Sequence, residues 1–516
     1  MMAPHPFVSL RLAVAFAVTA LAAAACEPPP GPSGITIVNA HIIDGSGGPP
    51  RQGAVRIVGD RIDAVGAFDP AAGDTVVDAG GLVLAPGFID THSHHDIDLL
   101  DMPDAIAAVS QGITSIVAGQ DGGQQFPLAD FFARLEASPV AINVASFAGH
   151  GTIRGQVLED DYQREATPEE IARMAAILDR ELDAGALGLS TGLEYDPGSF
   201  AATEEVIALA RIAAAKGGSY ISHIRSEDQY FWQAVDEAIR IGREAALPVR
   251  ITHIKLAMTR WWGQTDRLIA TLNGARDAGV DLSTDVYPYP AWTTSFGWLT
   301  TLFPDRDLDR RDGAEYILND MLSPEGILLA TYGPDTAYNG MTIAEIAAIR
   351  ETDPATTLMD LLKADRDGDP GTPASMMLGF AMDEPDIEAI MAWPHNVIGS
   401  DGELAGVHPR GYGTFPRFLG HYVRDRAVMS LEAGIRRITS LPASQVGIAD
   451  RGSIVAGAFA DLVLFDPESI ADQSTPEAPH RQSTGIVNVW VNGQVVFDEG
   501  QATGARPGRP LRRPDS

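Results

Sequence analysis

The amino-acid sequence predicts an α/β fold: a (β/α)8 barrel of the TIM type, a small β-sandwich domain built from both termini, and an inserted subdomain. Three observations lead to this prediction. Apolar β-like runs alternate with helical stretches through the middle of the chain, as in parallel α/β folds. Both ends are rich in short strands and turns instead. One interval between candidate strands, residues 287–396, is too long for a single crossover helix.

The barrel is predicted over residues 88–445, because eight candidate strands occur there and most are separated by about one strand-helix unit. The long interval places the inserted subdomain at about 297–375. The eight candidate strands are Phe88–His92, Ile113–Ala118, Ala141–Phe147, Leu187–Thr191, Ser219–His223, Val249–His253, Leu282–Val286 and Val397–Ser400.

The β-sandwich domain is predicted over residues 35–87 together with 446–505. Short strands broken by turns, such as Ala54–Val58 and Thr75–Asp78, fill the first segment. Asp461–Phe465 repeats this pattern near the C-terminus, and Asn492-Gly493 between apolar runs is typical of a type I′ hairpin turn. The two β-rich ends therefore predict one domain assembled from both termini.

The N-terminus is typical of a bacterial lipoprotein. Residues 1–25 contain Arg11 and an apolar run that is too short to anchor a membrane span, which indicates a signal peptide. The cysteine that would be lipidated is Cys26, and residues 26–34 form a Pro-rich tether. We expect an exported, periplasmic protein, lipid-anchored to a bacterial membrane at Cys26 and touching the membrane only there; the alternative is an ordinary cleaved signal peptide.

Composition excludes several classes of protein. The 516 residues carry a net charge of −32, which would repel phosphate backbones, so we expect no nucleic-acid partner. The chain has a single cysteine, which excludes an intrachain disulfide and any metal site made of several cysteines. Hydrophobic residues make up 45% of the chain, as in ordinary globular proteins.

Metal-ligating side chains gather at the carboxyl ends of the candidate strands, where such barrels place their active sites. Two histidines follow the first strand, one ends each of the fifth and sixth, and an aspartate follows the eighth. Four histidines and a carboxylate from separate strands form a zinc-type ligand set with room for a hydrolytic water. These residues are His92, His94, His223, His253 and Asp401.

A serine hydrolase is the competing interpretation. Gly188 to Gly192 fits the G-x-S-x-G pattern around Ser190. That nucleophile elbow requires a turn that leads directly into a helix, whereas a loop-like stretch with Pro197 and Gly198 follows here. The metal interpretation is therefore favoured.

Several motifs together resemble one family. They include "PGFIDTHSH" (86–94), "GHGTIR" (149–154), "GALGLSTGLEYDPGSFA" (185–201), "YISHIRSE" (220–227), "ITHIK" (251–255), "HPRGYGTFPRFL" (408–419) and "ADLVLFDP" (460–467). From about residue 35 onward the chain resembles the amidohydrolase superfamily, and within it the N-acyl-D-amino-acid deacylase (D-aminoacylase) family. The resemblance implies zinc-dependent hydrolysis of N-acylated D-amino acids, with one or two Zn²⁺ per subunit.

The resemblance also implies roles for the metal ligands. His92, His94 and Asp401 match one metal position, and His223 and His253 match the other. The family holds the second metal with a further cysteine, but this chain has Asp121 in the corresponding loop. Asp121 is the predicted replacement, because a carboxylate can also bind or bridge zinc. Two alternatives stay open: Glu194 is the bridging acid, or Asp121 only caps its turn.

Substrate contacts are predicted around these ligands. Lys255 should lie on the same side of its strand as His253, and Arg410 can hold a carboxylate in a bidentate fork. For both cations a structural ion pair is the alternative. The resemblance adds Tyr195, Tyr287 and Thr293 near substrate, and Trp292 at a place where a small residue is common.

Two further assignments concern residues around the ligands. His150 is predicted to support the ligands or to touch substrate. Arg225 and Glu227 are expected to form an ion pair that positions His223.

The predicted reaction is hydrolysis of the amide bond of an N-acyl-D-amino acid, a small substrate with a free carboxylate. Asp401 would take the proton of the attacking water and deliver it to the departing amine. The alternatives are a D-dipeptidase or a cyclic amidohydrolase on the same scaffold, and an inactive lipid-anchored binding protein, suggested by the missing cysteine ligand.

Overall fold

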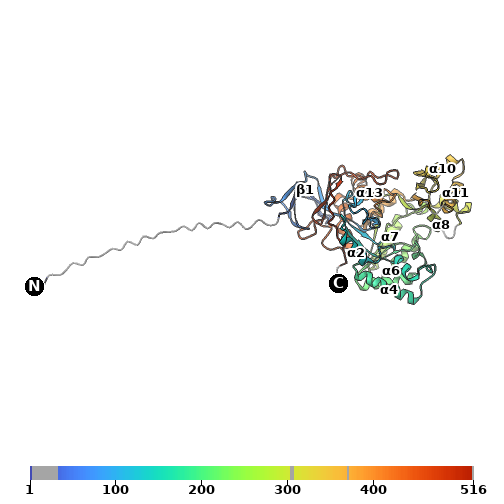
Figure 1. Ribbon diagram of the computed structural model, residues 1–516, viewed down its shortest axis with the longest axis horizontal. Coiled ribbons are helices and arrows are strands. Elements are labelled where there is room, and N and C mark those ends of the chain that lie inside the picture. The colour runs from blue at the N-terminus through green and yellow to red at the C-terminus, as the bar shows by residue number, and fades with distance from the viewer. Residues whose placement is uncertain (3–32, 303–306, 369–370, 514–516) are drawn as a thin grey trace.

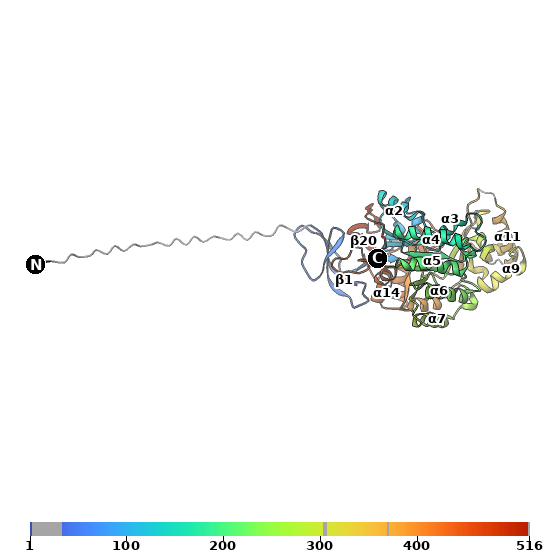
Figure 2. The ribbon, with the colours of Figure 1, turned by 90° about the horizontal axis from the view of Figure 1, so that it is seen from below.

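The computed structural model describes residues 1–2, 33–302, 307–368 and 371–513. Within these residues, eight parallel segments form a barrel at the centre of the molecule, with helices outside it (Figures 1 and 2). One segment is interrupted at Phe147 and so gives two strands, β8 and β9. The barrel strands are β6 (Phe88–Asp90), β7 (Ile113–Ala118), β8 (Asn143–Ser146), β9 (Ala148–Gly149), β10 (Gly188–Gly192), β11 (Ser219–His223), β12 (Val249–Ile251), β13 (Leu282–Val286) and β18 (Asn396–Ile398).

The barrel closes between β18 and β6 through the loops that follow these strands. The backbone N–H of Asp401 donates to the carbonyl of His92 at 2.8 Å, and that of His94 donates to Gly402 at 2.9 Å. Ser93 and Gly402 also form a parallel bridge. The closure therefore fixes the backbones of three predicted ligands against one another.

The predicted barrel strands agree closely with the observed ones. Those over Ile113–Ala118, Ser219–His223 and Leu282–Val286 have the predicted bounds. The first, sixth and eighth end two residues earlier than expected, so His92 and His253 stand just beyond their strands. At His253 the cause is a left-handed backbone with φ of 33°, which a strand cannot contain.

Helices cover the outside of the barrel and pack on its core. The helix α4 begins at Pro168 because Thr167 and Glu170 form a capping box, with proline at a position that needs no N–H donor. The other helices of this layer are α1 (Ile106–Val109), α2 (Leu128–Ala137), α3 (His150–Leu158), α5 (Thr203–Ala215), α6 (Phe231–Ala245), α7 (Thr265–Asp277), α12 (Glu384–Ala392), α13 (Arg410–Arg417), α14 (Leu431–Ile438) and α15 (Ser440–Val446), with α4 itself spanning Pro168–Asp183.

The terminal segments form a second domain around one sheet. In the described residues this sheet has nine strands in the order β22-β21-β20-β19-β5-β1-β2-β3, with β4 paired to β1. Asn492 and Gly493 join β20 to β21 with φ of 48° and 78°, as a type I′ turn requires, so this prediction is confirmed. The strands are β1 (Ile35–Ile42), β2 (Arg51–Val58), β3 (Arg61–Gly66), β4 (Thr75–Asp78), β5 (Val83–Pro86), β19 (Leu462–Phe465), β20 (Ile486–Val491), β21 (Gln494–Asp498) and β22 (Gln501–Ala502).

The sheet of the terminal domain contributes to two cores. Leu462 and Trp490 pack inside the terminal domain, whereas Val463, Phe465 and Val489 pack in the core of the barrel. Alternate residues of a strand point to opposite faces, so β19 and β20 are buried on both sides. The two domains therefore share their central strands.

The inserted subdomain spans residues 291–380, a wider range than the predicted 297–375. Its outer strands β14 (Ala291–Ser295) and β17 (Met376–Phe380) pair antiparallel and close its base. Its own core surrounds side chains such as Leu358 and Met377. Figures 1 and 2 show this subdomain at the end of the molecule opposite β1. Its remaining elements are β15 (Ile327–Thr331), β16 (Met341–Thr342), α8 (Leu299–Leu302), α9 (Arg311–Tyr316), α10 (Ile343–Arg350) and α11 (Pro354–Arg366).

The C-terminal residues return to the barrel. The N–H of Leu511 donates to the carbonyl of Val144 in β8 at 2.7 Å, and that of Arg513 donates to Gly185 at 3.0 Å. Val144 also forms a parallel bridge with Pro510. The last described residues thus add a short extended segment beside β8.

The predicted signal peptide beyond its first two residues, the anchor at Cys26 and most of the tether lie outside the described residues. Among the described residues, no helix combines the length and apolar character needed to cross a bilayer.

Candidate metal centre

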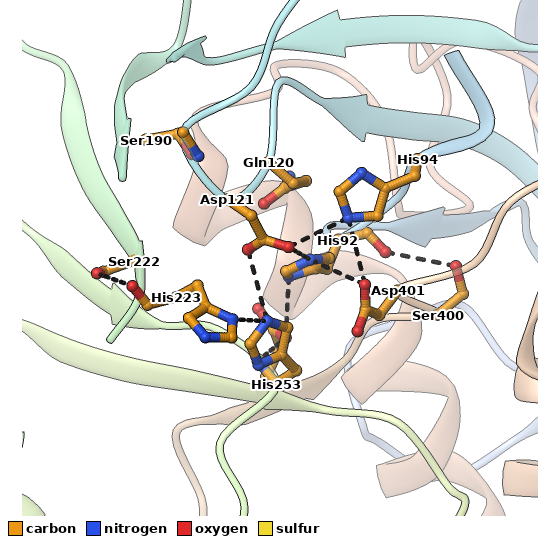
Figure 3. A network of polar contacts seen from close by, with 12 residues as sticks. His92, His94, Gln120, Asp121, Ser190, Ser222, His223, His253, Ser400 and Asp401 are labelled. Atoms are coloured by element: carbon orange, nitrogen blue, oxygen red, sulfur yellow. Dashed lines mark hydrogen bonds and ion pairs between the residues drawn. The ribbon is translucent and has the colours of Figure 1, made fainter. Parts of the chain in front are cut away.

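The six predicted ligand residues converge at the carboxyl ends of the barrel strands (Figure 3). Each comes from the end of a strand or from the loop after it, because parallel strands present their carboxyl ends at the same rim. They are His92 and His94 after β6, Asp121 after β7, His223 at the end of β11, His253 after β12 and Asp401 after β18.

The first group contains His92, His94, Asp121 and Asp401. Asp401 Oδ1 lies 3.4 Å from His92 Nε2 and 3.3 Å from His94 Nε2. Asp121 Oδ2 lies 3.4 Å and 3.2 Å from the same two nitrogens. Two imidazoles and two carboxylates thus surround one point.

The second group contains Asp121, His223 and His253. Asp121 Oδ1 lies 3.5 Å from His253 Nε2, which is 3.0 Å from His223 Nδ1. The two oxygens of Asp121 therefore face different groups of histidines, as a carboxylate that bridges two metal positions would.

Three of these residues have left-handed backbone conformations. The φ values are 52° at Asp121, 33° at His253 and 50° at Asp401. Such conformations are costly, persist where the surrounding structure enforces them and cluster at functional sites. Here they turn each chain out of its strand direction, so that the side chain reaches the centre of the barrel mouth.

The carboxylate of Asp121 is not used to cap its own turn. It contacts imidazoles, and within the described residues no backbone N–H donates to it. The turn at Asp121 and Gly122 instead relies on their left-handed backbones and on Ser190, whose hydroxyl accepts the N–H of Gly122 at 3.1 Å. The geometry thus favours the ligand interpretation over the capping one.

Charge around the site keeps both acids ionised. Burial alone would raise the pKa of Asp401, but Arg410 and His92 hold that pKa well below its usual value. Arg410 Nη1 lies 2.7 Å from Asp401 Oδ2. Burial likewise opposes ionisation of Asp121, yet His92 and His253 lower its pKa. Ionised carboxylates are the forms that bind metal.

The residues present fit a zinc ion on their own chemistry. Nitrogen and carboxylate oxygen are ligands that Zn²⁺ prefers, and each group supplies at least three. His92 Nε2 and Asp121 Oδ1 are buried and have no hydrogen-bond partner among the described residues. Buried polar atoms are rarely left without a partner, and a cation in the first group would satisfy His92 Nε2 while one in the second would satisfy Asp121 Oδ1.

Glu194 does not face Asp121. Its Oε2 lies 2.7 Å from His223 Nε2, the ring nitrogen opposite the one that points to His253. Burial raises the pKa of Glu194, against the lowering effect of His223. Glu194 is thus placed to orient His223 rather than to bridge the two groups.

The predicted ion pair between Arg225 and Glu227 is wrong. Arg225 Nε donates to Glu237 at 2.8 Å, on the helix that follows. Glu227 turns inward and accepts hydrogen bonds from Lys255 at 2.5 and 2.6 Å. Lys255 therefore forms a structural ion pair in this structure, which was the alternative to its predicted contact with substrate.

A cavity of about 420 Å³ opens above the two groups. The barrel supplies its polar floor, and the inserted subdomain supplies aromatic, thioether and hydroxyl side chains over it. The lining residues that belong to the inserted subdomain are Trp292, Thr293, Thr294, Ser295, Trp298, Met321 and Met376.

The predicted substrate residues mostly line this cavity. Arg410 and Tyr287 lie together, with the guanidinium 4.8 Å from the ring centre, and the buried Tyr287 hydroxyl has no hydrogen-bond partner among the described residues. Tyr195 places its hydroxyl 3.1 Å from His223 Nδ1. Thr293 donates its hydroxyl to the carbonyl of Met377 at 2.9 Å and keeps its lone pairs for the cavity.

His150 lies apart from this cavity. It is fully buried at the start of α3, where its Nε2 is 2.8 Å from Glu205, and Arg154 shares the same carboxylate oxygen at 3.1 Å. His150 is therefore part of a buried structural network, and the prediction of a substrate contact is not supported by its position.

The sequence did not place Glu227 or Trp298 in the cavity. Glu227 follows His223 by four residues in a loop, a spacing that also suits an ordinary ion pair. The ring of Trp298 lies 4.8 Å from the ring of Tyr195, measured between the ring centres. Trp298 belongs to the inserted subdomain, where the sequence showed no strand end. The sequence gives no signal that could have found Trp298.

The fold and the centre together define a metal-dependent hydrolase barrel. Residues 75–302 and 330–497 match the amidohydrolase family. An N-acyl-D-glutamate deacylase of Alcaligenes xylosoxydans xylosoxydans is 38% identical over 503 residues, which cover 93% of this chain and 96% of the relative. The chain therefore belongs to the amidohydrolase family.

Two solved structures resemble this one over 93% of the chain and 100% of their own length, each with a TM-score of 0.81. One is a D-aminoacylase, 35% identical, studied for the functional role of its binuclear metal centre. The other is the N-acyl-D-glutamate deacylase of Bordetella bronchiseptica, 34% identical, in complex with zinc and a phosphonate inhibitor that mimics the tetrahedral intermediate of the reaction.

Proposed function

We propose that this protein hydrolyses the amide bond of N-acyl-D-amino acids, using one or two Zn²⁺ per subunit, and releases a D-amino acid and a carboxylate. The observation that carries the proposal is the pair of ligand groups joined by Asp121 beneath a cavity that contains Arg410. Relatives and solved structures that span nearly the whole chain bear names of this activity.

Zinc held by His92, His94, Asp121 and Asp401, and by His223 and His253, would polarise the amide carbonyl and lower the pKa of a water molecule to about 7. Asp401 accepts the proton of that water and delivers it to the departing amine nitrogen.

Arg410 links substrate binding to the action of Asp401. In the structure the guanidinium of Arg410 forms an ion pair with Asp401 Oδ2. A substrate carboxylate offers Arg410 a planar fork of two oxygens, which suits guanidinium better than a single oxygen does. Arg410 then turns toward the substrate and leaves Oδ2 open to receive a proton. The hydroxyl of Tyr287 lies beside this place and donates to the same carboxylate.

We infer that the side chain of the preferred substrate is apolar. Among the described residues the cations that line the cavity are Lys255 and Arg410, and both already face an acid of the floor. Two further acids, Asp228 and Glu403, also line it. A second carboxylate on the substrate would find repulsion there, whereas the indole of Trp292 and its neighbours offer apolar contact.

Location is a separate proposal. We propose that the protein is exported and held at a bacterial membrane by a lipid on Cys26, with the tether between the anchor and the first strand. Support comes from the sequence of residues 1–26 alone.

One experiment tests the activity. Purified protein with measured zinc content is given N-acetyl derivatives of D- and L-methionine, D- and L-phenylalanine and D-glutamate, together with D-dipeptides and a hydantoin. We expect the N-acetyl-D-methionine and N-acetyl-D-phenylalanine rates to exceed all others. Equal D and L rates, or turnover of the hydantoin or the dipeptides alone, would overturn the proposal.

A further inference from the structure

His253 lies between two competing partners on one side and the second ligand group on the other. Its Nε2 faces Asp121 Oδ1 at 3.5 Å and His223 Nδ1 at 3.0 Å. Its Nδ1 lies 3.0 Å from Glu227 Oε1 and 2.8 Å from the ammonium of Lys255. The imidazole thus has one nitrogen in the centre and one in contact with an ion pair.

The two partners demand opposite tautomers of His253. A neutral imidazole has one N–H and one lone pair, and only the lone pair can bind a metal. The ammonium of Lys255 can only donate, so a hydrogen bond from it to Nδ1 puts the proton on Nε2 and blocks that ligand. The carboxylate of Glu227 can only accept, so its hydrogen bond keeps the proton on Nδ1 and frees Nε2.

Glu227 is also placed to occupy Lys255. Both of its oxygens accept hydrogen bonds from the ammonium. Lys255 is 4% exposed and His253 2% exposed, so both depend mainly on protein groups such as Glu227 for their partners. The backbone N–H of Glu227 is held in turn by Glu194 Oε1 at 3.2 Å, and the other oxygen of Glu194 holds His223.

We propose that Glu227 is the positioning residue that makes His253 a metal ligand, by holding the proton on Nδ1 and keeping Lys255 away from that nitrogen. The inference rests on the proposed metal centre and adds a requirement to it. Carboxylates behind metal-bound histidines contribute roughly 10–100-fold in metal affinity. Here the contribution has a second part, because removal of Glu227 leaves a cation directly against the ligand ring.

The effect should be confined to one metal position. The first group is built from His92, His94, Asp121 and Asp401. None of these four forms a hydrogen bond or ion pair with Glu227 or Lys255. Loss of Glu227 therefore weakens the second zinc and leaves the first unchanged.

The test is a double-mutant cycle read out as zinc binding. Wild type, Glu227→Ala, Lys255→Ala and the double variant are titrated with zinc against a chromophoric chelator, and the metal bound after dialysis is counted. We expect Glu227→Ala to lose at least tenfold in affinity for the second zinc with the first retained. We expect the double variant to recover to within a few-fold of Lys255→Ala, because the competing donor is gone.

Two controls make the outcome decisive. Glu227→Leu keeps most of the side-chain volume without an acceptor if the alanine variant does not fold, and it should show the same loss, rescued by Lys255→Ala. The ¹⁵N shifts of His253 should report an Nδ1–H tautomer in zinc-loaded wild type. Unchanged zinc affinity in the Glu227 variants, or no recovery in the double variant, would overturn the inference, whereas failure of wild type to bind zinc would overturn the proposed function instead.

Discussion

The Oε2 atom of Glu194 lies 2.7 Å from Nε2 of His223, on the side of the ring that points away from Asp121. A hydrogen bond there fixes the proton on Nε2 and leaves Nδ1 free to bind metal. The sequence offered Asp121 and Glu194 as alternatives for the acid that joins the two metal positions. In the structure Asp121 faces both histidine groups, whereas Glu194 orients His223 from behind.

Variants of these two acids should separate the roles. Asp121→Ala should lose zinc and activity together, since it removes an oxygen from each group. Asp121→Cys should retain zinc more tightly than wild type, because thiolate is the softer and more electron-donating ligand. Glu194→Gln should keep most of its zinc after dialysis against a chelator. Metal analysis of the three proteins decides, and loss of zinc from Glu194→Gln alone would reverse the assignment.

Asp401→Asn should lower kcat by several orders of magnitude without unfolding the protein. The amide can occupy the same place beside Arg410 but cannot carry a proton from water to the amine. Steady-state rates and thermal unfolding are to be measured together. The matched control is Asp472→Asn, which also changes an acid facing an arginine, Arg417 at 3.6 Å, and should keep its rate. A near wild-type rate in Asp401→Asn would contradict the role.

Gly379→Ala should change which side chains the cavity accepts. Gly379 lies opposite Trp292 across β14 and β17, and an added Cβ would stand 2.6 Å from the indole. The ring must move, so kcat/KM for N-acetyl-D-phenylalanine should change several-fold relative to N-acetyl-D-alanine, with zinc content unchanged. Gly274→Ala is the control, because a Cβ there meets nothing within 4 Å. Equal changes for both substrates would mean that Trp292 does not set selectivity.

The buried network around Glu205 should make stability depend on pH. Burial opposes ionisation, but His150 and Arg154 lower the pKa of Glu205 below 4.5. A lowered carboxyl pKa stabilises the fold fully above pH 4.5 and progressively less as the pH falls through the folded-state pKa. Glu205→Gln should cost about 3 kcal/mol at pH 7, and less at pH 3. Denaturant unfolding at both values measures this difference.

The neighbouring acid on the same helix provides the comparison. Glu204 pairs with Arg240 at the surface, where both side chains are largely in water. Glu204→Gln should therefore change stability by less than about 1 kcal/mol at either pH. Equal costs for the two variants would show that burial of the network does not matter.

Cys26→Ser should release the protein from the membrane fraction into the soluble periplasm, with unchanged specific activity. The prediction follows from the lipoprotein-like sequence and from the separation of the anchor from the barrel by the tether. Fractionation of cells that express each form, with activity measured in both fractions, provides the check. A variant that stays with the membranes would show that no lipid on Cys26 holds the protein there.

The barrel and its ligands could be predicted because both leave local signals. Buried parallel strands are short apolar runs, and ligand side chains follow them at once. The base of the inserted subdomain left no such signal, since Thr293 and Thr294 in β14 are polar residues that face the cavity mouth. Its boundaries were therefore placed a few residues too far inward.

The arrangement behind the ligands could not be predicted for a different reason. Spacing along the chain suggests that Glu227 pairs with Arg225. In the structure the loop turns Glu227 inward toward Lys255, and Arg225 pairs with Glu237 on α6 instead. His150 follows a barrel strand as the ligand histidines do, yet it begins a helix and points at Glu205. Which way a side chain points after a strand depends on loop conformation, and a single sequence carries little information on that.

The shared strands of the two domains bear on the order in which the chain can fold as it is synthesised. β1, β2 and β3 are made first, but the neighbours of β5 in the sheet include β19, which is made more than 370 residues later. Leu511 then adds to β8 from almost the last position of the chain. The edge of β5 that pairs with β19 stays unpaired until synthesis is nearly complete, and pairing of strands so far apart in the sequence is slow. Completion of the barrel and of the terminal domain is therefore one late event, so fragments that stop before about residue 460 should not accumulate as folded protein.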